Sequence, residues 1–324
     1  MLTRRELLFG AAAAAAPRLC SGLAAFGRQP APAQADVSFL MPPGATDCHA
    51  HIFCDQKAFP MFGGRSYTPD PAPVSEYIAL ARRLHVERVV LIQPSIYGSD
   101  NDCMLAAIRE LGFRARGIAV VDEKTPESEL DAMFRAGVRG IRINLETTGQ
   151  SDPAAARDRF QAAVKQIGAR KLHIQMFTRP TVIAAIKDLV DASPVTVVFD
   201  HFGGAQGAAG VEQPGFDALV SLVQSGKAYV KLSGAYRGST QAPAYENMAP
   251  LAKALFAANP QRILWGSDWP HPDTSPDARS SDTGTSPRLP IDDVALLNQL
   301  AVWVPTIPQR RAVLVENPAR LYGW

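Results

Sequence analysis

From about residue 46, short apolar runs rich in Val, Ile and Leu alternate with longer amphipathic stretches. The short runs predict buried parallel strands, and apolar residues that recur every three or four positions in the longer stretches predict helices. The predicted strands are Thr46–Phe53, Arg88–Pro94, Ala115–Asp122, Gly140–Leu145, Lys171–Phe177, Val195–Phe202, Tyr229–Gly234 and Ile263–Ser267. The predicted helices are Val74–Leu84, Asn101–Leu111, Thr125–Ala136, Asp152–Ile167, Pro180–Ala192, Phe216–Ser225 and Tyr245–Ala258. Eight such units predict an α/β fold, a single-domain (β/α)8 TIM barrel.

The competing architecture is a doubly wound open sheet. Such a sheet normally carries a glycine-rich first turn, and no G-x-G-x-x-G follows the first predicted strand. Two segments fall outside the repeat, Cys54–Pro73 after the first strand and His271–Pro290 after the eighth. In a barrel both segments lie at the C-terminal mouth, where substrate loops are found. The terminal stretches are expected to form closing helices, at Ile291–Leu300, Gln309–Val315 and Asn317–Tyr322.

The N-terminal segment differs from the rest of the chain. The paired Arg4 and Arg5, the run Ala11–Ala16 and the following Arg18 resemble a twin-arginine export signal, and Ala33-Gln34-Ala35 offers a cleavage point. The alanine run is short for a membrane span. We therefore expect a signal peptide over residues 1–35 and the barrel over residues 36–324. The expected location is the periplasm, reached through the twin-arginine machinery, with no stable membrane anchor.

Charge and cysteine content narrow the class of protein. The net charge is +2 and no basic run occurs, so neither nucleic acid nor an anionic membrane is an expected partner. Beyond the signal the cysteines are Cys48, Cys54 and Cys103. An odd number cannot form a complete disulfide framework, and the spacing matches no zinc pattern. Buried thiols are therefore expected.

Polar residues at the ends of two predicted strands point to a reaction centre. His49 and His51 are two positions apart, so they project to the same side of the first strand, with Asp47 below them. Asp268 ends the eighth strand, which lies beside the first in a closed barrel. A carboxylate beside imidazoles can take a proton from water and later return it to a leaving group.

A third histidine and several polar residues complete the candidate site. His201 ends the sixth strand, on the opposite side from Asp200, so only one of the two is expected to face the lumen. His173 begins its strand and is not expected to be catalytic. The residues expected to contact substrate are Arg142, Arg237, Ser95, Gln175 and Tyr236. The arginines suit a carboxylate-bearing substrate, although each could instead form an ordinary surface salt bridge.

Nucleophilic catalysis is disfavoured because no G-x-S-x-G motif is present and Cys48 has no obvious activating geometry. The residues around the candidate site resemble a known family. These are Asp-Cys-His49-Ala-His51, Phe-Asp-His201-Phe-Gly-Gly, Trp-Gly-Ser-Asp268-Trp-Pro-His-Pro and the closing Glu-Asn-Pro-Ala-Arg-Leu-Tyr-Gly. Together they resemble the amidohydrolase-related (amidohydrolase 2) family, over about residues 40–324. The most similar subgroup includes 2-pyrone-4,6-dicarboxylate lactonase and sulfomuconolactone hydrolase.

The resemblance implies a lactonase, a hydrolase that opens a small, carboxylate-bearing cyclic ester. By position, His49, His51 and His201 would polarise the lactone carbonyl, and Asp268 would activate water. The wider superfamily uses zinc, but Gly140–Leu145 offers no Lys or Glu ligand, so a two-metal centre is not expected. Two cofactor states stay open: none required, or a single divalent ion such as zinc on His49, His51 and Asp268.

Three other functions stay open. A metal-dependent decarboxylase of an aromatic or related carboxylic acid resembles the lactonases in its His-x-His pair and strand-8 aspartate. A lactone isomerase is disfavoured because the His-x-His pair is intact here. A binding protein on a decayed barrel is disfavoured because the four polar residues at the mouth, His49, His51, His201 and Asp268, are all present.

Overall fold

In a computed structural model of the protein, residues 36–147, 149, 152–168, 170–275 and 284–324 are described, and they contain eight parallel strands in the order β1 to β8. The strands are β1 (Thr46–Ala50), β2 (Arg88–Ile92), β3 (Ala115–Ala119), β4 (Val138–Asn144), β5 (His173–Phe177), β6 (Val197–Phe199), β7 (Ala228–Ser233) and β8 (Ile263–Gly266). Just beyond β8, Ala50 bridges to Trp269, and the Asp268 amide donates to the His49 carbonyl at 2.8 Å. The eighth strand thus returns beside the first, and the predicted barrel is confirmed.

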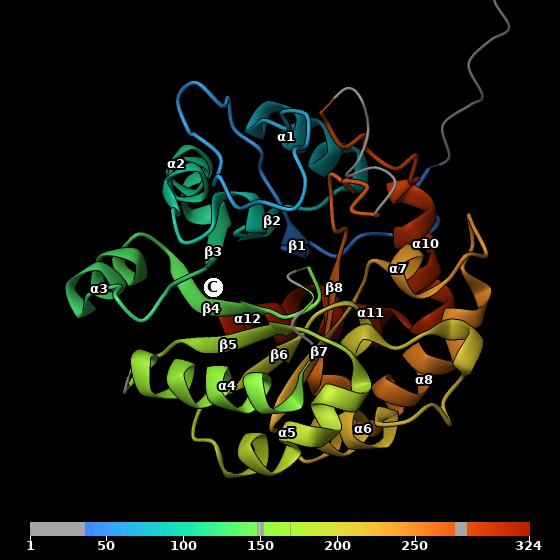
Figure 1. Cartoon of the computed structure of the whole chain (residues 1–324). Helices are drawn as coiled ribbons and strands as arrows, with labels where there is room; N and C mark the ends of the chain where they lie inside the picture. The colour runs from blue at the N-terminus through green and yellow to red at the C-terminus, as the bar shows by residue number, and fades with distance from the viewer. Residues whose placement is uncertain (1–35, 148, 150–151, 169, 276–283) are drawn as a thin grey trace, which may run out of the picture. The chain divides into compact units, whose positions relative to one another are not determined.

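The helices form a ring outside the strands (Figure 1). They are α1 (Val74–Leu84), α2 (Asp102–Leu111), α3 (Glu127–Arg135), α4 (Pro153–Ile167), α5 (Pro180–Ala192), α6 (Phe216–Gln224), α7 (Ala235–Gly238), α8 (Ala249–Ala258), α10 (Asp293–Trp303), α11 (Ile307–Arg311) and α12 (Asn317–Tyr322). A π-helical turn, Ala312–Glu316, joins the last two. None of the described helices is both long and apolar enough to cross a bilayer. The predicted signal, residues 1–35, lies outside the described residues.

Strand residues alternate between two environments. Ile141 and Ile143 pack with Phe160 of α4 in the layer between the strands and the helices. Arg142, between the two isoleucines, points to the barrel interior, as the pleat of a strand requires. A smaller cluster contains one or two residues from each of several strands, and these residues meet around the barrel axis. Tyr322 belongs to this cluster and contacts His173, so α12 closes the N-terminal end of the barrel.

Two segments cover the opposite end of the barrel. The segment after β1 and the segment after β8 are joined where the Ser286 amide donates to the Thr68 carbonyl at 2.6 Å. Cys54 forms a disulfide with Cys103 at the start of α2, with the Cα atoms 6.0 Å apart, so the expectation of three thiols was wrong. The two cysteines are 49 positions apart, and sequence spacing alone does not reveal that β1 and α2 bring them together. Cys48 is free and buried, as expected.

Candidate active site

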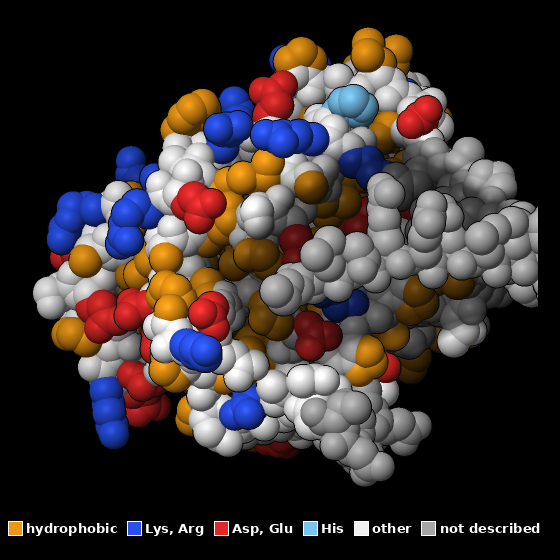
Figure 2. Space-filling view, turned by 90° about the horizontal axis from the view of Figure 1, so that it is seen from above, with side chains coloured by type: hydrophobic (Ala, Val, Ile, Leu, Met, Phe, Trp, Pro, Cys, Tyr) orange, Lys and Arg blue, Asp and Glu red, His pale blue; other side chains and the backbone are white. Residues whose placement is uncertain are grey.

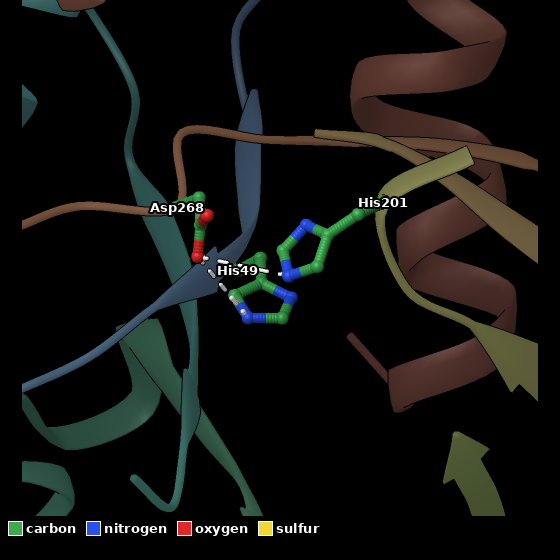
Figure 3. Close-up of side chains that lie close together, drawn as sticks. All are labelled: His49, His201 and Asp268. Carbon is green, nitrogen blue, oxygen red and sulfur yellow. Dashed lines mark ion pairs between the residues drawn. The ribbon is translucent and has the colours of Figure 1, made fainter. Parts of the chain in front are cut away.

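Four side chains converge at the C-terminal mouth of the barrel. The Nε2 atoms of His49 and His51 each lie 3.6 Å from Oδ1 of Asp268, and Nε2 of His201 lies 3.8 Å from it. Figure 3 shows His49, His201 and Asp268 pointing toward one another from three different segments of the chain. All four residues are buried. The structure therefore brings together the four residues that the sequence selected for catalysis.

The first strand reaches this arrangement through an irregularity. Between Asp47 and Ala50, β1 has one residue more than β2, so the simple alternation of side chains is broken. The sequence predicted that Asp47 lies below the two histidines. In the structure Asp47 accepts hydrogen bonds from Ser267 Oγ at 2.6 Å and from Tyr77 on α1 at 3.2 Å. It also accepts from the His49 amide at 3.0 Å, which holds the irregular strand in place.

Both residues that follow β6 face the site, contrary to the expectation that only one would. Asp200 has extended backbone, whereas His201 has a φ of 50°, in the left-handed region that side chains rarely adopt. Because of this turn, the His201 ring lies over the C-terminal mouth of the barrel, beside Asp268. Gly234 makes room for the ring, because a Cβ there would lie 2.8 Å from His201 Nδ1 and 3.0 Å from Asp268 Oδ2.

Two residues predicted to contact substrate, Tyr236 and Arg237, form hydrogen bonds to Asp268. Its Oδ2 accepts a hydrogen bond from the Tyr236 hydroxyl and another from Arg237 Nε, both at 2.6 Å. Burial alone would raise the pKa of Asp268, but Arg237 and the neighbouring histidines hold that pKa well below its usual value. The carboxylate is therefore ionised near neutral pH. His271, which lies 3.3 Å from the Tyr236 hydroxyl and 3.0 Å from Asp293, supports this arrangement.

A fully buried polar cluster lies beside the histidines inside the barrel. Lys231 Nζ donates to Gln175 Oε1 at 2.6 Å and lies 3.3 Å from Asp200 Oδ1 and from His49 Nδ1. Asp200 Oδ2 accepts from Gln175 Nε2 at 3.1 Å and from Arg142 at 3.4 Å. Gln175, predicted to contact substrate, uses both of its amide atoms here. The alternation along β7 places Lys231 in the interior, but the sequence gives no partner for it.

Burial determines the protonation state of His51 and His201, and a hydrogen bond determines the tautomer of His51. Burial lowers the pKa of His51, and burial lowers that of His201 to about 4, so both rings are neutral near pH 7. His51 Nδ1 lies 2.8 Å from the Ile92 carbonyl oxygen, which can only accept. The proton of neutral His51 is therefore on Nδ1, and Nε2 offers a lone pair to the site. His201 Nδ1 lies 3.0 Å from Ser233 Oγ, which can donate or accept.

The site residues have the spacing of a single-metal centre. One ligand atom from each of His49, His201 and Asp268 lies within 4.8 Å of the other two. Buried His49 Nε2 and Asp268 Oδ1 have no hydrogen-bond partner, and their 3.6 Å separation is close to the ~3.4 Å expected between neighbouring tetrahedral zinc ligands. The group differs from the set expected from the sequence, because His201 takes the place of His51.

A cleft of about 1010 Å³ lies at the ends of β2 to β4, and its lining residues do not include the three histidines or Asp268. Arg142 and Ser95 both line the cleft, so the structure places these predicted substrate residues where a ligand has room. From above, the molecule shows basic, acidic and hydrophobic side chains interspersed (Figure 2). The cations near the site are Arg142, Arg237 and Lys231.

Comparison with known proteins identifies the family. The family model described as amidohydrolase matches residues 46–324. The chain belongs to the amidohydrolase family. A 4-sulfomuconolactone hydrolase from Rhizobium radiobacter is 35% identical over 289 residues, which cover 89% of this chain and 93% of that protein. A 2-pyrone-4,6-dicarboxylate hydrolase from Comamonas testosteroni is 30% identical over 293 residues, which cover 88% of this chain and 92% of that protein.

A solved structure gives the same picture. It is a probable 2-pyrone-4,6-dicarboxylic acid hydrolase from Acinetobacter baumannii with citric acid bound, 28% identical, with a TM-score of 0.71 over 87% of this chain and 100% of that one. The resemblance read from the site motifs is thus confirmed. This amidohydrolase is a hydrolase that acts on cyclic esters, and its substrate is a small molecule.

Proposed function

We propose that this amidohydrolase opens a lactone that carries a carboxylate, with Asp268 as the base that activates water. The observation that carries the proposal is the buried Asp268 carboxylate, which is kept ionised by Arg237 and lies 3.6–3.8 Å from three imidazoles. A base must be ionised and within reach of a water molecule beside the carbonyl. The related proteins act, by their names, on a sulfonated lactone and on a dicarboxylated pyrone.

Asp268 and the histidines have separate roles in the proposed reaction. Asp268 takes a proton from water, and the hydroxide oxygen forms a bond to the lactone carbonyl carbon. His49 and His201 lie beside the position of the carbonyl oxygen and stabilise the negative charge that develops there, whereas the Nε2 lone pair of His51 can accept a hydrogen bond from the attacking water. As the ring C–O bond breaks, Asp268 returns the proton to the leaving oxygen. A divalent ion bound by His49, His201 and Asp268 would add Lewis-acid polarisation of the carbonyl.

The charges near the site favour an anionic substrate. Three cations, Arg142, Arg237 and Lys231, lie at the site, where they pair with Asp200 and Asp268. Arg142 lines the cleft and presents a planar fork suited to a carboxylate. The related structure that holds citric acid, a tricarboxylate, supports the same substrate class. We propose that Arg142 and Ser95 hold the substrate carboxylate, while Arg237 and Tyr236 orient Asp268.

The decisive experiment replaces Asp268 with Asn, which keeps the shape of the side chain and removes the base. A panel of carboxylated lactones is followed by acid release. Turnover of the best substrate should fall at least 100-fold in Asp268→Asn, while binding is retained. An unchanged rate would refute the role of Asp268. Release of CO2 from an aromatic acid, or conversion of one lactone to another without acid release, would favour the decarboxylase or the isomerase instead.

We also propose that the protein is exported and processed before Asp36. The Arg4-Arg5 pair motivates this proposal, and the Cys54–Cys103 disulfide supports it because disulfides persist in oxidising compartments. N-terminal sequencing of protein from the periplasmic fraction should give Asp36 as the first residue. A matched Arg4→Lys, Arg5→Lys variant should remain in the cytoplasm with its first 35 residues attached. Export of that variant at the normal level would refute a twin-arginine route.

A further inference from the structure

Lys231 is buried without an evident structural reason. It lies on β7 with 0% exposure, in a part of the barrel that side chains such as Val, Ile and Leu normally fill. Taking an ammonium group out of water costs several kcal/mol, and partners recover that cost only with good geometry. An apolar side chain of similar length would fill the same space without that cost. The lysine therefore calls for an explanation in the chemistry of its neighbours.

The contacts of Lys231 define what it does to His49. An ammonium group only donates hydrogen bonds, and Lys231 Nζ lies in hydrogen-bonding geometry 3.3 Å from His49 Nδ1. Asp200 Oδ1 also approaches Nδ1, at 3.2 Å, but this buried oxygen makes no hydrogen bond, so Lys231 is the group in hydrogen-bonding geometry with Nδ1. Burial lowers the pKa of Lys231, whereas Asp200 favours its charged form, and Gln175 and Asp200 hold the ammonium in position.

We propose that Lys231 is a positioning residue that donates to His49 Nδ1 and so places the ring proton of His49 on Nε2, facing the substrate. Nε2 is buried, has no partner and lies 3.6 Å from Asp268 Oδ1, where the lactone carbonyl oxygen has to enter. His49 is then a hydrogen-bond donor to the developing oxyanion. His51 has the opposite tautomer, because the Ile92 carbonyl accepts from its Nδ1.

The two histidines of the His-x-His pair thus have different hydrogen-bonding roles. His49 donates from Nε2, and His51 offers an Nε2 lone pair that can accept a hydrogen bond from the attacking water. A divalent ion on His49 would have to displace the Nε2 proton while the Lys231 ammonium stays against Nδ1. The kinetic consequence of this arrangement rests on the proposed lactone hydrolysis, whereas the tautomer does not.

The tautomer can be read directly by NMR of protein labelled with ¹⁵N-histidine. The chain has six histidines, and loss of one set of ring signals in His49→Gln assigns those of His49. Protein as isolated, with its metal content measured, should show His49 with a bare Nδ1 and a protonated Nε2. A proton on Nδ1 with a bare or metal-bound Nε2 overturns the proposal, and this result needs no variant.

The matched variants are Lys231→Met, which keeps the length and apolar stem of the side chain, and Lys227→Met in the turn before β7. In Lys231→Met the His49 proton should move to Nδ1, and kcat should fall about 100- to 1000-fold, the usual effect of losing an oxyanion donor, with a smaller change in KM. Lys227→Met should leave the signals and the rate unchanged.

An unmoved proton in a folded Lys231→Met overturns the proposal. If the His49 proton moves in Lys231→Met but the wild-type protein opens no lactone, the proposed function is refuted and the role of Lys231 is not.

Discussion

Breaking the Cys54–Cys103 disulfide tests how the loop after β1 is held over the site. In Cys54→Ser, Cys103→Ser the folded contacts stay nearly the same, but the unfolded chain regains the freedom of a loop whose ends are 49 positions apart. The loop-entropy relation for that length gives about 14 cal/mol/K, or about 4 kcal/mol at 25 °C. For a domain of this size each kcal/mol shifts the melting temperature by about 2 °C, so the expected loss is roughly 8 °C.

The assay is urea and thermal unfolding of the wild type and the double variant, with and without reductant. Reductant should lower the wild type to the stability of the variant and leave the variant unchanged. Thiol titration of the mature, unfolded wild type should find one thiol, that of Cys48. A stability difference below about 1 kcal/mol would refute the loop-entropy reasoning, and three free thiols would refute the disulfide itself.

Three further predictions concern charged and polar groups. Tyr236→Phe removes a 2.6 Å hydrogen bond to ionised Asp268 worth about 1.5–3 kcal/mol, so the acidic limb of the kcat/KM profile should move up by about one to two pH units; an unmoved limb would contradict that bond. Burial lowers the pKa of His173 to about 3 in the folded state, so the unfolded state binds more protons and stability falls as the pH drops from about 6.5. In His173→Gln the slope of unfolding free energy against pH should be shallower by about 1.4 kcal/mol per unit, and an equal slope would show that His173 titrates normally. Arg142→Lys loses the planar fork and should raise KM for a carboxylated lactone about 10- to 100-fold with a smaller change in kcat; an equal effect on an uncharged lactone would rule out carboxylate recognition.

The periodicity of the chain determined the barrel and most element bounds. The predicted helix Val74–Leu84 and the predicted helix Pro180–Ala192 coincide with α1 and α5, because apolar residues recur there at helical spacing. Most strands were predicted too long at their C-terminal ends, as for Val195–Phe202 against Val197–Phe199, whereas β5 ends at Phe177 as predicted. In β6 the chain turns away from the sheet after Phe199, although Asp200, His201 and Phe202 remain buried. Position at a strand end, together with barrel closure, also singled out the four residues of the candidate site.

Only the tertiary structure decided how those residues are held. A one-residue irregularity in β1 and the left-handed backbone of His201 changed which side chains face the site, and neither leaves a mark in a simple alternation pattern. The roles of Arg237 and Lys231 depend on partners that are 31 and 182 positions away in the chain, Asp268 and His49. Periodicity reports which face of an element a residue occupies. Which partner it meets there depends on distances between strands that only folding sets.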